Sequence, residues 1–85
     1  MSNFDLIESL LSNLLIASAG ELSDTEREEV QAFIDVGEYG LALETTADIY
    51  AEEKKNPSAE VQILIKRLAI AMAMEPESVL KRLQM

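Results

Sequence analysis

The side chains of this sequence that could do chemistry are mostly carboxylates. The chain carries 16 Asp and Glu residues against seven Lys and Arg, and it contains neither cysteine nor histidine. Without these two residue types, disulfides, the usual zinc sites and Ser-His or Cys-His nucleophile pairs cannot form, and the commonest neutral-pH general base is missing. Catalysis would have to rest on carboxylates and lysines alone, so we expect no enzyme activity.

Three of the acids, Glu44, Asp48 and Glu52, recur every four residues and would share one face of a helix. A calcium loop would need an Asp-rich 12-residue segment with a central glycine and a closing glutamate, and no such segment is present. A carboxylate site between helices would need Glu-x-x-His from a second helix, which a chain without histidine cannot supply. We therefore predict no metal site and no cofactor.

The stretch GEYGLALE, residues 37–44, places two glycines just before an apolar and acidic run. A glycine-rich turn that leads into a helix can bind phosphate through free backbone N–H groups and the helix dipole. Glu38 stands between the glycines and would repel an anion, and no Lys or Arg accompanies it. The simpler interpretation is a tight connector in which Gly37 ends one helix, while Gly40 gives freedom or close packing at the start of the next.

Charge is distributed unevenly along the chain. The net charge is −9; residues 1–53 hold 13 acids and one base, giving −12, whereas residues 54–85 hold three acids and six bases, giving +3. A strongly acidic protein is a poor partner for polyanions such as nucleic acids and anionic membranes. A solvated face that keeps the protein soluble is one interpretation; the other is a surface that attracts a basic protein.

Apolar residues recur at helical spacing in four segments. The first helix is expected over Asn3–Ala17, and the second begins at the capping-box sequence Ser23-Asp24-Thr25-Glu26 and runs to about Asp35. The apolar positions of these two helices are Phe4, Ile7, Leu10, Leu11, Leu14 and Leu15 in the first, and Val30, Phe33 and Ile34 in the second.

The third helix is expected from within GEYGLALE to about Lys54, and the fourth over about Ala59–Met74, after the break at Pro57. Pro76 would start a short final helix. The third should bury a face centred on Tyr39, Leu43, Ala47 and Tyr50, and the fourth should bury Val61, Leu64, Ile65, Leu68 and Met72. Since no segment alternates like a strand, we predict an all-α fold over residues 1–85, a single domain with an antiparallel bundle of four helices plus a short C-terminal helix.

A second apolar stripe on the fourth helix, Ile63, Ile70 and Met74, has two interpretations. It is typical of a helix buried nearly all round; if exposed, it marks a surface for another protein or for a weak homodimer. The N-terminal apolar run is interrupted by polar residues and lacks a preceding basic cluster, so neither a signal peptide nor a membrane span is indicated. We expect a cytoplasmic protein.

Two resemblances bear on function. Acyl carrier proteins are also small, acidic and four-helical, but the Asp-Ser-Leu motif of their second helix is absent where this chain reads Leu22-Ser23-Asp24-Thr25. The segment Val30–Glu53, which contains QAFIDVGEYGLALETTADIYAEE, together with Val61–Leu83, resembles the Maf-type immunity proteins of bacterial polymorphic toxin systems. It is also similar to some immunity proteins of contact-dependent growth inhibition.

That resemblance implies a non-enzymatic inhibitor that binds and neutralises a cognate toxin C-terminal domain, often a nuclease with a basic surface. We expect the third helix and the turn before it to face the toxin. The predicted partner-binding residues are Asp35, Glu38, Tyr39, Glu44, Asp48 and Glu52. The alternative is a small acidic intracellular adaptor or antitoxin-like module unrelated to secreted toxins.

Overall fold

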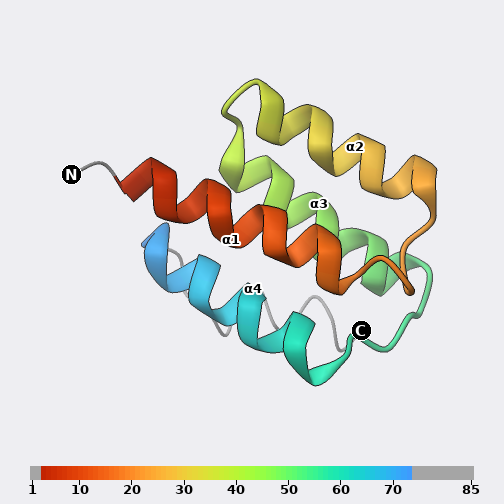
Figure 1. The fold of residues 1–85 in the computed structure, drawn as a ribbon. Helices are drawn as coiled ribbons and strands as arrows, with labels where there is room; N and C mark the ends of the chain where they lie inside the picture. The colour runs from red at the N-terminus through yellow and green to blue at the C-terminus, as the bar shows by residue number, and fades with distance from the viewer. Residues whose placement is uncertain (1–2, 74–85) are drawn as a thin grey trace.

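The structure contains the four main helices that the sequence predicts, with consecutive helices running antiparallel (Figure 1). This computed structural model describes residues 3–73. Within that range no strand occurs, so the fold is all-α. The helices are α1 (Asn3–Ala17), α2 (Asp24–Asp35), α3 (Tyr39–Glu52) and α4 (Ala59–Ala71). The short helix predicted from Pro76 onward lies outside the described residues.

The helices pack as two pairs that α1 joins. α1 lies along α4, α2 lies along α3, and α1 also contacts α2 and α3. Apolar side chains from all four helices form one core, and removing this apolar surface from water is the main force that holds the pairs together. The largest fully buried side chains are Tyr50, Leu11, Leu14, Leu43, Ile65 and Leu68.

The apolar stripe of α1 is buried except at its first residue. Ile7, Leu11 and Leu14 are buried, but Phe4 is 64% exposed. Phe4 lies in the first turn of the helix, where its ring meets the Tyr39 ring instead of the core. Phe33 of α2, also expected in the core, is only partly buried against it.

α3 is buried over most of its surface. Ala42, Leu43, Thr46, Ala47, Ile49 and Tyr50 are all buried. Tyr39, which the spacing predicts as part of this face, is half-buried at the helix start. The acidic residues of α3 occupy the remaining side of the helix.

α3 and α4 end earlier than the sequence predicts because the chain turns into the left-handed region. Lys54 has φ 52°, and the Lys55 N–H donates to the Tyr50 carbonyl at 2.9 Å, which closes α3 at Glu52. Ala73 has φ 56°, and α4 ends at Ala71. Neither residue is a glycine, so the sequence gives no signal for these two stops.

The outer stripe of α4 is exposed, which contradicts the interpretation of a helix buried nearly all round. Ile63 is 56% exposed and Ile70 is 63% exposed, while Leu64, Ile65 and Leu68 on the opposite side are buried. Ala69 completes the buried side, and Met72 is only half-buried. Met74, the third residue of the stripe, lies outside the described residues.

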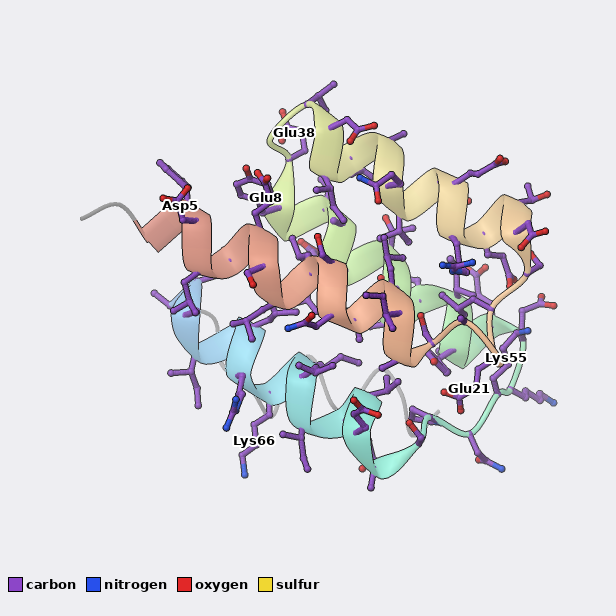
Figure 2. All side chains as sticks on the ribbon, viewed as in Figure 1. Asp5, Glu8, Glu21, Glu38, Lys55 and Lys66 are labelled. Atoms are coloured by element: carbon purple, nitrogen blue, oxygen red, sulfur yellow. The ribbon has the colours of Figure 1, made fainter. Side chains whose placement is uncertain are left out.

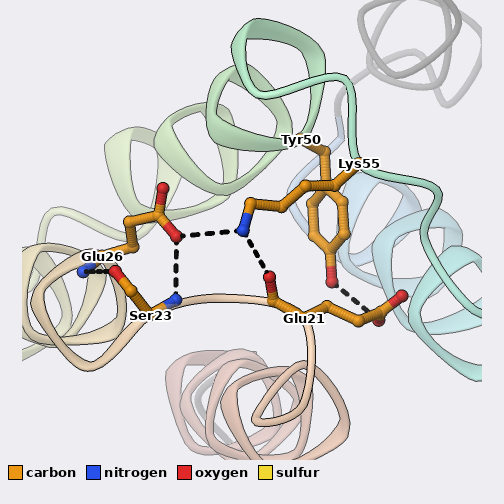
Figure 3. Close-up of polar contacts among 5 residues, drawn as sticks. All are labelled: Glu21, Ser23, Glu26, Tyr50 and Lys55. Atoms are coloured by element: carbon orange, nitrogen blue, oxygen red, sulfur yellow. Dashed lines mark hydrogen bonds and ion pairs between the residues drawn. The ribbon is translucent and has the colours of Figure 1, made fainter.

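A set of polar contacts joins the α1–α2 loop and the start of α2 to the end of α3 and the loop that follows it (Figure 3). The Tyr50 hydroxyl donates to Glu21 Oε1 at 3.0 Å, and Lys55 Nζ donates to the Glu21 carbonyl at 2.7 Å. Lys55 also lies 3.6 Å from Glu26 Oε1. Ser23 and Glu26 form the predicted capping box at the start of α2. We refer to these five residues as the polar lock, because they fix two loops against one buried helix.

Candidate functional site

The GEYG turn is fixed by the way in which α2 ends. Gly37 has φ +76°, and its N–H donates to the Ile34 carbonyl at 3.0 Å. The Glu38 N–H donates to the Phe33 carbonyl at 2.9 Å. This pair of bonds is a Schellman motif with glycine in its left-handed position, so the prediction that Gly37 stops the helix is confirmed.

Gly40 does not have the role that the sequence suggests. It lies in the first turn of α3 with an ordinary negative φ, and a Cβ added there would meet nothing within 4 Å. Neither conformational freedom nor close packing therefore requires a glycine at this position. What Gly40 leaves is open space beside Tyr39.

That open space belongs to a groove at one end of the bundle. The groove has a volume of about 530 Å³ and is open to solvent. The start of α1, the GEYG turn, α3 and the end of α4 all contribute to it. Its lining residues are Phe4, Ile7, Gly37, Glu38, Tyr39, Gly40, Glu44 and Met72. Among the residues that the structure describes, apolar side chains and two carboxylates form this lining, and none of these lining residues is basic.

Tyr39 is held at the edge of the groove by α1. Its hydroxyl donates to Glu8 Oε2 at 2.7 Å, and its ring lies 6.1 Å from the Phe4 ring, tilted by 45°. The hydrogen bond to the Glu8 carboxylate raises the pKa of the Tyr39 phenol, with Asp5 adding a smaller effect of the same sign. Tyr39 is therefore a neutral, oriented aromatic donor among acids.

Carboxylates surround this end of the molecule. Figure 2 shows Asp5, Glu8 and Glu38 at the end where α1 begins, whereas Glu21 and Lys55 lie at the opposite end. Glu38 is the N-cap of α3, but its side chain makes no capping hydrogen bond. Its exposed carboxylate therefore stays accessible to a partner.

Exposed apolar side chains accompany these acids. Besides Phe4, Val36 is 72% exposed and Leu41 is 46% exposed. Val36 precedes the GEYG turn and Leu41 follows it. Exposed apolar groups clustered among polar ones are typical of surfaces that bind other proteins.

The six predicted site residues divide between the groove and its surroundings. Glu38, Tyr39 and Glu44 line the groove. Asp35 is exposed at the last residue of α2 and accepts a hydrogen bond from Gln31 Nε2 at 2.8 Å. Asp48 and Glu52 are exposed and continue from Glu44 along the outer side of α3. The groove and this side of α3 are called the acidic surface below.

Sequence reasoning missed the contribution of α1 to this site. From the sequence, Phe4 is predicted only as an apolar position of the first helix, and nothing there singles out Asp5 or Glu8. Phe4 carried one usable signal, since an aromatic residue in the first turn of a helix lies near the edge of a bundle. Glu8 gave no signal, because only the fold brings it to Tyr39, 31 residues further along the chain.

Neither a cluster of metal-ligating side chains nor a helix able to span a membrane is found among the described residues. Among residues 3–73, no three His, Cys, Asp or Glu side chains come together so that they could hold a metal ion. In the same range, no helix has both the length and the apolar character needed to cross a membrane. The polar lock contains a tyrosine and a lysine, but both are engaged in contacts between elements of the fold.

Comparisons with known proteins give no identification. No model of a protein family, no curated protein and no solved structure matches this chain.

Proposed function

We propose that this protein is a non-catalytic immunity protein that binds and neutralises a basic bacterial toxin domain through the acidic surface. The observation that carries the proposal is the groove at the GEYG turn, where the described lining residues combine apolar side chains with carboxylates and include no base. The resemblance of Val30–Glu53 to Maf-type immunity proteins supports the same function.

Charge complementarity is the first physical argument. A nuclease binds a polyanion, so its cleft carries Lys and Arg side chains. A protein of net charge −9 attracts such a surface from a distance, which raises the association rate and favours basic partners over others. The same charge makes direct binding to nucleic acid unfavourable.

The apolar part of the groove supplies the second argument. Long-lived complexes depend on a few aromatic or aliphatic contacts that exclude water, while rim charges contribute mainly to rate and selectivity. Phe4, Ile7 and Met72 provide apolar lining beside the carboxylates of Glu38 and Glu44. We expect an apolar side chain of the toxin to enter the groove while neighbouring Lys or Arg residues approach the carboxylates.

Tyr39 contributes to binding by being held in place before the toxin arrives. Its hydrogen bond to Glu8 and its contact with Phe4 restrict the ring in the free protein. An ordered side chain loses less conformational entropy on binding than a mobile one, so its contacts add more to affinity. The proposal needs no cofactor, and it places the protein in the cytoplasm, where it would meet the toxin.

A rescue experiment tests whether the protein is an immunity protein. The C-terminal domain of the toxin that we expect the adjacent gene to encode is expressed in cells with or without this protein, and binding is followed by pull-down from the same cells. We expect growth to be restored and the two proteins to be recovered together. The absence of both rescue and binding would contradict the proposal and would favour an adaptor or antitoxin-like module.

A further inference from the structure

The exposed face of α4 has the layout of a self-complementary surface. Ile63 and Ile70 lie seven residues apart, so they stand on nearly the same side of the helix, about 10 Å apart along its axis. Both are more than half exposed. Ala59 precedes Ile63 by one turn, and a shallow hollow of about 320 Å³ lies between Ala59, Gln62, Ile63 and Lys66.

Charged residues flank this stripe in an ordered way. Glu60 and Arg67 are also seven residues apart and lie along one edge of the stripe, while Gln62 and Lys66 lie along the other. Figure 2 shows Lys66 pointing away from the bundle. Within residues 3–73, Glu60, Lys66 and Arg67 form no ion pair. They are therefore available to a second molecule.

The net charge of the molecule restricts which surfaces of two copies can meet. Two chains of charge −9 repel each other, and the acidic surface would make this repulsion worst. α4 contains two bases and one acid, a net charge of +1. Its outer face is therefore a surface through which two copies can approach with little local repulsion.

We propose that two copies associate through α4, packed antiparallel about a two-fold axis that passes near Ile63. In such an interface, residue i faces residue j and j faces i. With the axis level with the midpoint between Ile63 and Leu64, Glu60 of each copy faces Arg67 of the other. The same alignment brings the two Ile63 side chains together, each beside the hollow next to Ala59.

Other alignments of the same two helices are less favourable. An axis one turn further along, level with Lys66 and Arg67, would place bases of one copy opposite bases of the other. A parallel arrangement would align Glu60 with Glu60 and Arg67 with Arg67. Like charges that face each other are destabilising, so the Glu60–Arg67 alignment is favoured.

The dimer is expected to be weak. One helix pair covers less than the roughly 1,200 Å² of a small standard interface, and the overall negative charge opposes association. The dissociation constant should accordingly lie between about 0.1 and 1 mM. The acidic surface lies outside this interface, so the dimer can form independently of toxin binding.

Sedimentation velocity of the full chain over a range of concentrations tests this interface. We expect the sedimentation coefficient to rise with concentration for the unchanged protein and to stay at the monomer value for Glu60→Arg and for Arg67→Glu. The decisive sample is an equimolar mixture of these two variants. One then has Arg at both positions and the other Glu at both, so a mixed pair regains both Glu–Arg contacts, and the mixture should associate more tightly than either variant alone.

Two further variants separate this interface from general charge effects. Glu29→Arg makes the same charge change as Glu60→Arg on the exposed side of α2 and should leave dimerisation no weaker than in the unchanged protein. The double variant Glu60→Arg/Arg67→Glu restores complementarity and should dimerise again. Circular dichroism confirms that each variant is folded. A monomer at about millimolar concentration, or a mixture that does not associate, would overturn the proposal.

Discussion

At the scale of single residues, the two tyrosines show how similar bonds serve different purposes. Tyr50 is fully buried, and burial, with the hydrogen bond to Glu21, raises the pKa of its phenol. Tyr39 makes an equivalent bond to Glu8 at the edge of the groove. The Tyr50 bond joins parts of the fold, whereas the Tyr39 bond orients a side chain that faces solvent.

Tyr50→Phe should lower the free energy of unfolding by about 1 to 2 kcal/mol, because the Glu21 carboxylate loses its hydroxyl donor in a partly buried place and keeps the longer contact with the Ser58 N–H, at 3.5 Å. Urea denaturation at neutral pH measures the change. Tyr39→Phe is the matched control, and its effect should be smaller, because Glu8 is exposed and water can replace the hydroxyl. Equal losses in the two variants would show that the polar lock adds no particular stability.

Glu26 gives a prediction for pH dependence. The backbone N–H of Ser23 donates to its carboxylate, and this bond, assisted by Lys55, lowers the pKa of Glu26 below 4.5. A carboxyl whose pKa is lowered by folding stabilises the protein above its unfolded pKa and loses that contribution as pH falls through the folded pKa. The stability difference between the unchanged protein and Glu26→Gln should therefore be largest at neutral pH and shrink below about pH 4.5.

Urea denaturation of the unchanged protein and of Glu26→Gln at several pH values checks this expectation. Comparing the two proteins at each pH cancels the titration of the other acids, which is common to both. A difference that stays constant from neutral to acidic pH would mean that the capping bond does not depend on the charge of Glu26.

At the scale of elements, the two glycines of the GEYG turn should respond oppositely to alanine. Gly37→Ala forces a side chain into φ +76° and should cost about 1 kcal/mol of stability. Gly40→Ala adds a methyl group to a helical residue with open space around it and should leave stability unchanged or raise it by about 0.5 kcal/mol. Thermal or urea denaturation compares them. A larger loss at Gly40 would contradict the open space in the structure.

Local signals in the sequence predicted the elements well. The Ser23–Glu26 capping box, the Gly37 stop and the break at Pro57 each act within a few residues, so their effects can be predicted without knowing the fold. The helix ends near Lys54 and Ala73 could not be predicted. Both residues have a left-handed backbone conformation, and the residue types Lys and Ala do not indicate one. The spacing of apolar residues predicted the apolar stripe of each helix but not the helix against which that stripe packs.

The candidate site was only partly predictable for the same reason. Glu38, Tyr39 and Glu44 lie close together in the chain, so their proximity in the fold could be predicted from the sequence. Phe4 and Glu8 reach Tyr39 only because α1 packs beside α3. The exposure of Ile63 and Ile70 likewise depends on which side of α4 meets α1, and the amphipathic pattern alone left that open.

At the scale of the whole molecule, the polar lock and the groove that we propose as the binding site lie at opposite ends of the bundle. The polar lock joins the loops at one end, while the start of α1, the GEYG turn and the end of α4 form the groove at the other (Figure 2). This arrangement suits a protein whose function is to hold a partner.

The most direct test of the proposed function is the affinity of the protein for the toxin domain at low and high salt. The variant Glu38→Lys/Glu44→Lys changes the groove, and Glu28→Lys/Glu29→Lys makes the same charge change on the exposed side of α2. We predict that the groove variant binds at least about tenfold more weakly and loses much of the salt dependence, while the control changes little. Equal affinities and salt dependences for the groove variant and the unchanged protein would contradict the account.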